Sequence, residues 1–293
     1  PIIFFFFFNR KIGIIFICII LIVIGSCGTD TIIQNNEPPP YDIASAVRGG
    51  IMFDRFWSTE AGFNQSDTNI ALFNTRPEFF KCNHCHGWDN LGRFGSYIGR
   101  GPNSVRPNVA GLNLYSISLT KTPQDLFNSL KTAENRRNIR FDFSVYIPQD
   151  PNDSAHRMPN YGEILTEAQL WDLVKFLKEG TMNVSELYNA SYSGIYPTGT
   201  ASFFNIGKDG NPANGINYYL TKCSLCHGPQ GTEILVEGMT LGNFTRTKPY
   251  EVQHKIKYGK PGSNMTGNYD ISLTQMRDLY KALSDSSSFP NLE

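Results

Sequence analysis

The chain has 293 residues, enough for two domains of ordinary size, and the 40% that are apolar are typical of a globular protein rather than a disordered one. Its 26 basic and 26 acidic residues give a formal net charge of zero. Proteins that bind nucleic acid need a basic face to neutralise phosphates, so this balance excludes nucleic acid from the expected partners.

The N-terminal segment has the pattern of an export signal. Asn9–Lys11 is basic, and the apolar run Ile12–Ile24 that follows is shorter than the ~20 residues of a membrane span. The small residues before Cys27 resemble the cleavage site of bacterial lipoproteins, in which the cysteine carries the lipid. We expect a signal peptide over 1–26 and a flexible, lipid-anchored tether over 27–40. The rest of the chain is then expected on the periplasmic side of a bacterial membrane, and the outer membrane and the cell surface are alternative locations. Residues 1–26 could instead be an ordinary signal peptide or an uncleaved anchor.

A short motif with two cysteines and a histidine occurs twice. The sequence C-x-x-C-H-G runs from Cys82 to Gly87 and again from Cys223 to Gly228. C-x-x-C-H is the attachment signature of c-type haem, because two thiols on one helical turn can bond to one porphyrin while the next residue presents a histidine nitrogen to the iron. Structural zinc usually groups its C-x-x-C pairs within a few tens of residues, and a thioredoxin-like dithiol needs a βαβ setting. Haem is therefore the preferred interpretation of both copies.

Comparison of the two copies indicates which histidine binds the iron. His86 corresponds to His227 in the second copy. His84 corresponds to Leu225, which cannot bind iron. We therefore expect His86 and His227 to be ligands and His84 to be an exposed spacer.

A helix is predicted after each motif, over 165–177 and over 271–283. Each segment begins with a Thr or Ser cap followed three residues later by Gln, and apolar residues then recur at the i, i+3, i+4, i+7 spacing of a helix that lies on a core. The caps are Thr166 and Ser272. A methionine stands in a turn-rich segment before each helix. The repeat thus extends well beyond the cysteine motif.

The order of these features resembles the class I cytochrome c family, present twice. Each copy also has a Gly-x-x-x-aromatic pattern before the motif, at Gly49–Phe53 and at Gly215–Tyr219. The resemblance implies an all-α fold with two tandem cytochrome c-like helical domains, each wrapped around one covalent haem. Their expected ranges are 41–180 and 200–293, joined by a linker over 181–199.

Carried over residue by residue, the resemblance implies two covalently bound haem c groups. The implied site residues are Cys82, Cys85, Cys223 and Cys226 as thioether attachment points, His86 and His227 as proximal iron ligands, and Met158 and Met265 as distal ligands. A methionine in a loop more often fills a gap in a core than binds metal. These two stand 14 and 13 residues before the repeated Asp172 and Asp278, which favours the ligand role.

Three other residues are rivals for the distal positions. His156 lies two residues before Met158, and Met239 is a weaker rival to Met265. His254 lies on the helix expected before Met265 and is expected to be a solvated helix residue.

The first copy departs from the family by an insertion within 54–81, whose role the sequence does not indicate. In the family a proline carbonyl orients the ligand histidine. Pro107 fits that place in the first copy, and the second copy has no evident counterpart.

The resemblance implies an electron carrier rather than an enzyme, because two haems with both axial positions filled leave no open position for a substrate. Histidine–methionine ligation favours ferrous iron and gives a relatively high potential. The expected partners are other redox proteins, met through small surfaces. The alternatives are an electron-transfer subunit of a larger dehydrogenase, oxidase or other respiratory complex, and a dihaem peroxidase, in which one haem would open a coordination position.

Overall fold

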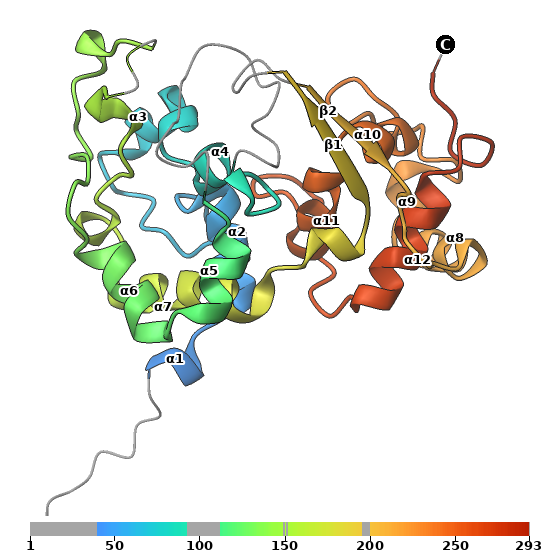
Figure 1. The fold of residues 1–293 in the computed structure, drawn as a ribbon, viewed down its shortest axis with the longest axis horizontal. Helices are drawn as coiled ribbons and strands as arrows, with labels where there is room; N and C mark the ends of the chain where they lie inside the picture. The colour runs from blue at the N-terminus through green and yellow to red at the C-terminus, as the bar shows by residue number, and fades with distance from the viewer. Residues whose placement is uncertain (1–39, 93–111, 149, 151, 195–199, 293) are drawn as a thin grey trace, which may run out of the picture. The chain divides into compact units, whose positions relative to one another are not determined.

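The computed structural model of the protein (Figure 1) describes residues 40–92, 112–148, 150, 152–194 and 200–292. The predicted signal peptide, Cys27 and Pro107 lie outside these ranges. Within the described ranges no helix combines the length and the apolar character that crossing a membrane requires.

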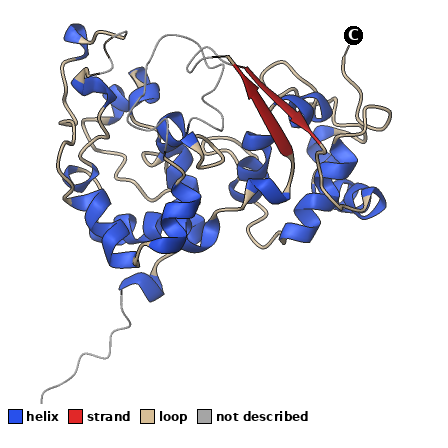
Figure 2. Cartoon of the chain, viewed as in Figure 1, coloured by secondary structure: helices blue, strands red, loops and turns tan. Residues whose placement is uncertain are grey.

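Helices dominate the described structure (Figure 2). They are α1 (Pro40–Ile43), α2 (Ala46–Arg55), α3 (Ile70–Thr75), α4 (Cys82–His86), α5 (Leu114–Thr120), α6 (Pro123–Lys131), α7 (Glu167–Lys175), α8 (Pro212–Lys222), α9 (Ser224–His227), α10 (Leu241–Thr247), α11 (Pro249–Tyr258) and α12 (Leu273–Leu283). A π-helical turn, Phe176–Gly180, continues α7.

A small sheet corrects the all-α expectation. Strands β1 (Asn189–Ser193) and β2 (Thr200–Phe204) pair antiparallel, with Asn189 opposite Phe204. They lie in and beside the segment predicted as a linker. Its Gly, Ser and Asn content favours turns, but Tyr192 in β1 and Phe203 and Phe204 in β2 are residue types that favour strands.

The two helices predicted after the motifs are confirmed as α7 and α12. Thr166 accepts a hydrogen bond from the backbone N–H of Gln169, whose side chain accepts one from the backbone of Thr166. Ser272 and Gln275 form the same reciprocal pair at the start of α12. Both helices thus begin with the capping box that the sequence indicates.

The same close helix contact occurs in each half of the chain. α2 packs against α7, and α8 packs against α12. A Cβ atom on Gly49 would lie 2.0 Å from the carbonyl oxygen of Asp172, and a Cβ atom on Gly215 would lie 2.0 Å from that of Asp278. Only glycine therefore permits the approach of the two helices, which explains the first residue of both Gly-x-x-x-aromatic patterns.

The carboxylates of the same two aspartates hold the starts of α2 and α8. Asp172 accepts a 2.6 Å hydrogen bond from the backbone N–H of Ser45 and pairs with Arg48. Asp278 accepts a 2.7 Å hydrogen bond from the backbone N–H of Asn211. The repeat seen in the sequence is thus also a repeat of contacts.

Two hydrophobic clusters form the core. One is built on α2, α6 and α7, and the other on α8, α11 and α12. Each cluster includes an aromatic residue from the other half of the chain. Tyr258 at the end of α11 belongs to the first cluster, and Trp88, two residues after α4, belongs to the second.

Candidate functional site

The first cysteine motif forms the short helix α4. Asn83 within it is fully buried, and its side-chain amide donates a 3.3 Å hydrogen bond to the carbonyl of Phe53 in α2. Gly87 ends the helix with a φ of 75°, a conformation that disfavours residues with a Cβ atom. The glycine of the motif therefore turns the chain away directly after His86.

The Met158 loop is fastened to the neighbouring backbone. The N–H of Arg137 donates to the carbonyl of Met158 at 2.9 Å, and the N–H of Asn160 donates to the carbonyl of Arg137 at 2.9 Å. Arg137 is buried, and its guanidinium donates to the carbonyl of Phe79 at 2.5 Å. Tyr161 donates to the carbonyl of Phe80 at 2.7 Å. These bonds tie the methionine loop to the residues just before the first motif.

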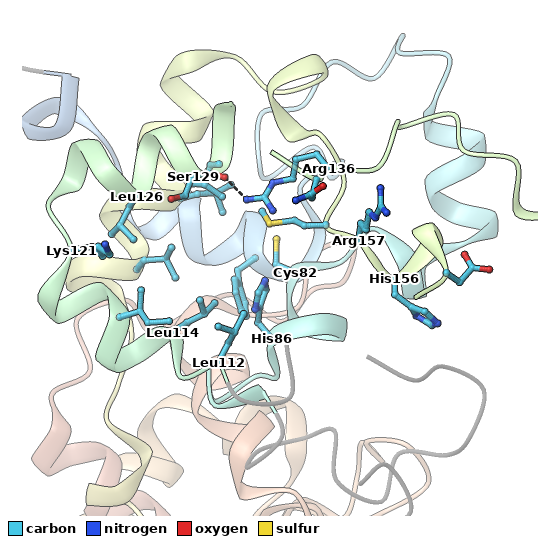
Figure 3. Close-up of a pocket in the computed structure, with 18 of the residues that line it drawn as sticks. Cys82, His86, Leu112, Leu114, Lys121, Leu126, Ser129, Arg136, His156 and Arg157 are labelled. Atoms are coloured by element: carbon cyan, nitrogen blue, oxygen red, sulfur yellow. Dashed lines mark hydrogen bonds between the residues drawn. The ribbon is translucent and has the colours of Figure 1, made fainter. Parts of the chain in front are cut away.

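Cys82, His86 and Met158 converge on one cavity of about 620 Å³ (Figure 3). Its walls are mainly apolar and come from Phe53, Leu112, Leu114, Ile117, Leu126, Leu130, Leu173 and Leu177. This volume is within the usual range for small-molecule and cofactor sites. A smaller cavity of about 30 Å³ shares Cys82, His86 and Met158 and is also lined by Cys85.

The ionisation of the first site suits metal binding by a neutral imidazole. Burial and, to a smaller extent, the charge of Arg136 lower the pKa of His86 to about 4. Histidine binds metal in this neutral form. Its Nδ1 atom is buried and has no hydrogen-bond partner among the described residues. Burial raises the pKa of the Cys82 thiol to about 12.

The donor set and the cavity fit a haem c group in the first half. The two thiols and the histidine come from one helical turn, the thioether of Met158 reaches the same cavity from a distant segment, and the apolar walls suit a porphyrin face. The sequence-predicted residues of the first site are therefore brought together.

The second motif forms α9 and ends in the same way. Gly228 has a φ of 73°, and Tyr219 of α8 donates a 2.5 Å hydrogen bond to its carbonyl. Burial lowers the pKa of His227, while the backbone of Ile234 acts in the opposite direction by favouring the protonated ring. The Nδ1 atom of His227 is buried and has no hydrogen-bond partner in the part of the chain that the structure describes.

The distal position of the second site has two methionine candidates. Met265 is partly exposed, and its carbonyl accepts a 3.0 Å hydrogen bond from the N–H of Lys260, which closes the loop after α11. Met239 packs with Cys223 against the second hydrophobic cluster. The ligand role of Met265 stays a prediction.

Two of the remaining histidines, His84 and His254, differ from their expected exposure. His254 was expected to be solvated but is only 1% exposed, because its ring lies among Phe53, Trp88, Phe176 and Tyr258. His84 is partly buried rather than exposed. His156 is buried and lines both cavities of the first site, so it remains a rival to Met158.

The two cysteine pairs do not share one site. In the part of the chain that the structure describes, no three His, Cys, Asp or Glu side chains gather as a cluster that could hold a metal ion. The four described motif cysteines are free.

Two arginines next to the site were not identified from the sequence. Arg136 and Arg137 are adjacent, and both contact the surroundings of the motif and the methionine loop. Their signal is weak, because a pair of arginines in a polar loop is usually solvated. Their position became evident only from the hydrogen bond between the backbone N–H of Arg137 and the carbonyl of Met158.

Comparison with known proteins agrees with the geometry of the first site. Residues 71–181 match the family model described as Cytochrome c, a segment that contains α4, the Met158 loop and α7. No curated protein and no solved structure matches the chain. The family match supports a c-type cytochrome, that is, a protein with covalently bound haem c that transfers electrons to and from redox partner proteins.

Proposed function

We propose that the protein is an exported, lipid-anchored electron carrier with two haem c groups, one in each half of the chain. The observation that carries this proposal is the convergence of Cys82, His86 and Met158 on one apolar cavity. The match of 71–181 to the cytochrome c family supports the same function.

In the first half, Cys82 and Cys85 would attach the haem, and His86 and Met158 would be its axial ligands. The bound group supplies an iron that accepts and releases one electron. Burial keeps His86 in the neutral form that can bind metal, and the leucine-rich walls would contact the apolar face of the bound group. The hydrogen bonds between Arg137 and the Met158 loop hold the backbone of this loop in place.

The second haem is proposed from the internal repeat. Cys223 and Cys226 would attach it, His227 would be its proximal ligand and Met265 its distal ligand. The repeated contact of Gly215 with Asp278, and the matching turn at Gly228, support a second site built like the first. With a histidine and a methionine holding each iron, the two groups would supply electron transfer rather than catalysis.

The proposed location follows from the sequence. Cys27 would carry the lipid that holds the protein on the periplasmic side of a bacterial membrane, and the tether up to residue 40 would give it reach. Its partners would be redox proteins, including those of a respiratory complex.

The number of haems is the first test. Intact mass and pyridine haemochrome absorbance of the purified mature protein should give two covalent haems per chain. The double substitutions Cys82→Ala/Cys85→Ala and Cys223→Ala/Cys226→Ala should each remove one haem. A wild-type protein with a single haem, or with none, would contradict the proposal.

The distal ligands are tested separately. The oxidised protein should show the near-infrared band that arises from methionine sulfur bound to ferric iron. Met158→Ala and Met265→Ala should each remove part of this band, whereas Met239→Ala should leave it intact. A band that survives in both ligand variants, or that Met239→Ala removes, would show that the assignment is wrong.

A further inference from the structure

The segment 54–81, an insertion in the first copy, contacts the methionine loop of the second half. The carboxylate of Glu60 accepts a 2.8 Å hydrogen bond from the backbone N–H of Gly262, which is 202 positions away in the chain. Gly262 stands three residues before Met265, the proposed distal ligand of the second site. A segment for which the sequence indicates no role thus reaches a loop that would supply an iron ligand.

The turn that carries Glu60 is fixed to the core of the first half. Its neighbours Trp57, Ala61 and Phe63 are buried in the first hydrophobic cluster. The backbone N–H of Ala61 donates a 3.2 Å hydrogen bond to the hydroxyl of Ser58. The first half therefore determines where the carboxylate of Glu60 lies.

A second side chain of the first half lies against Gly262. This glycine has a φ of 77°, and a Cβ atom on it would lie 2.9 Å from the Nη1 atom of Arg55. The hydrogen bond from Gly262 and, to a smaller extent, the charge of Arg55 lower the pKa of Glu60. Glu60 is thus ionised at neutral pH, and an ionised acceptor forms a stronger hydrogen bond than a neutral one.

The loop between Gly262 and Met265 is short and internally bonded. The N–H of Lys260 donates a 3.0 Å hydrogen bond to the carbonyl of Met265, and the N–H of Met265 donates a 3.2 Å hydrogen bond to the hydroxyl of Ser263. A Cβ atom on Gly259 would lie 2.4 Å from the carbonyl oxygen of Met265, so the loop closes tightly on the end of α11. A displacement of Gly262 would therefore also move the backbone of Met265.

The helix before this loop is held by the first half as well. Lys257 and Tyr258 of α11 donate hydrogen bonds of 3.0 and 2.6 Å to the carbonyl of Gly180. The Met158 loop, by contrast, is bonded to Arg137 of its own half. The distal segment of the second site thus depends on residues of both halves.

We propose that Glu60 is a positioning residue for the second site, because its carboxylate holds the Met265 loop in the closed conformation that would keep the methionine on the iron. The proposal rests on the proposed function, since it takes Met265 as the distal ligand. A loop that is open in a larger fraction of molecules leaves the iron position more accessible to a competing ligand.

The first measurement is hydrogen exchange by mass spectrometry on the full-length, haem-loaded protein. Glu60→Ala should accelerate exchange in 259–268 about tenfold, which is the order of the effect of one hydrogen bond to a charged group. Exchange in 155–162, around Met158, should not change. Glu60→Gln keeps a neutral acceptor and should accelerate exchange less than Glu60→Ala.

The second measurement is an imidazole titration of the oxidised Met158→Ala protein, in which the near-infrared band of methionine-bound iron would come from the second site. Imidazole that displaces the methionine removes this band. Glu60→Ala in the same background should lower the imidazole concentration of half-displacement about tenfold, because loop opening becomes more favourable by that factor. Faster exchange with an unchanged half-displacement concentration would overturn the proposal.

Glu134→Ala is the matched control. Glu134 is an exposed glutamate in another loop of the first half. Its removal changes the net charge by the same amount, so a general charge effect would appear in it too. An effect of Glu60→Ala no larger than that of Glu134→Ala, in either measurement, would also overturn the proposal.

The two measurements separate this proposal from the proposed function. A Met158→Ala protein that lacks the near-infrared band would defeat the assignment of Met265 and, with it, the role of Glu60. A band that is present, but that imidazole removes equally with and without Glu60, would defeat only the role of Glu60. If Glu60→Ala does not accumulate with two haems, Glu60→Gln decides. A half-displacement concentration at least twofold lower than in Met158→Ala alone supports the proposal, and a smaller change contradicts it.

Discussion

Asp54 of α2 and Lys255 of α11 form a buried ion pair, with Nζ 2.6 Å from Oδ2 and side chains that are 4% and 14% exposed. Lys81, the residue before the first motif, reaches the other carboxylate oxygen at 3.3 Å. The ammonium group of Lys255 also lies 4.1 Å from the centroid of the Trp88 ring. One carboxylate thus joins the start of the first motif to a helix of the second half.

Removal of this carboxylate is expected to lower the free energy of unfolding. Asp54→Asn would leave two buried ammonium groups without a counter-ion, and the free energy of unfolding should fall by about 3–5 kcal/mol. Urea unfolding followed by circular dichroism measures the loss. Asp209→Asn is the matched control, because Asp209 is exposed and asparagine adopts its positive φ as readily. Equal effects of the two substitutions would show that the ion pair contributes nothing.

The pH dependence of stability depends on the same carboxylate. Burial raises the pKa of Asp54, but the charges of Lys255 and Lys81 outweigh burial and lower it to about 2. An unfolded Asp titrates near pH ~3.9, so this contribution to stability is present above about pH 4 and is lost as the pH falls toward about 2.

Unfolding free energies of wild type and Asp54→Asn, measured across this range, should therefore converge on acidification. A difference that stays constant down to about pH 2 would exclude a depressed pKa for Asp54.

The glycines at the two helix contacts should not tolerate a methyl group. Gly49→Ala and Gly215→Ala would force apart α2 and α7, or α8 and α12, because the new Cβ atom would meet backbone carbonyl oxygen. Such overpacking costs about 1–3 kcal/mol, and at a 2.0 Å contact with backbone we expect it to outweigh the ~1 kcal/mol that alanine gains over glycine in a helix. Thermal unfolding should show a lower midpoint for both variants. Asn217→Ala, on the exposed side of α8, should show no loss.

Removal of the Trp88 side chain should lower the stability of the second half of the chain. Trp88→Ala removes a buried side chain from the second hydrophobic cluster, at a cost of about 3–5 kcal/mol. Hydrogen exchange measured by mass spectrometry should therefore increase in α11, whose His254 and Lys255 contact the Trp88 ring.

Trp57→Ala provides the comparison, because Trp57 is equally buried but belongs to the first cluster. It should increase exchange in α2 and α3. If Trp88→Ala affected only the first half, the assignment of Trp88 to the second cluster would be wrong.

Features that depend on neighbouring residues could be predicted from the sequence. The motif positions, the helices after them and their capping boxes depend on contacts over three or four residues, so α7 and α12 begin where Thr166 and Ser272 indicate. The convergence of Cys82, His86 and Met158 followed from a family resemblance rather than from periodicity.

Long-range contacts could not be predicted in this way. His254 was expected to be a solvated helix residue, but α11 lies between the two hydrophobic clusters and is buried on nearly all its faces. A hydrophobic pattern assumes one buried face and one exposed face, and it fails for such a helix. Arg136 and the pair of Asp54 with Lys255 were missed for the same reason, since their partners are distant in sequence.

Each hydrophobic cluster contains one aromatic residue from the other half of the chain, Tyr258 in the first and Trp88 in the second. This has a consequence for the expression of the two halves as separate fragments. A fragment that ends after residue 180 would lack Tyr258 and the ammonium group of Lys255, and a fragment that begins at residue 200 would lack Trp88. Each fragment would present an apolar surface where the missing aromatic ring packs, which promotes aggregation. Co-expression of the two fragments should rescue their solubility, because each supplies the side chain that the other lacks.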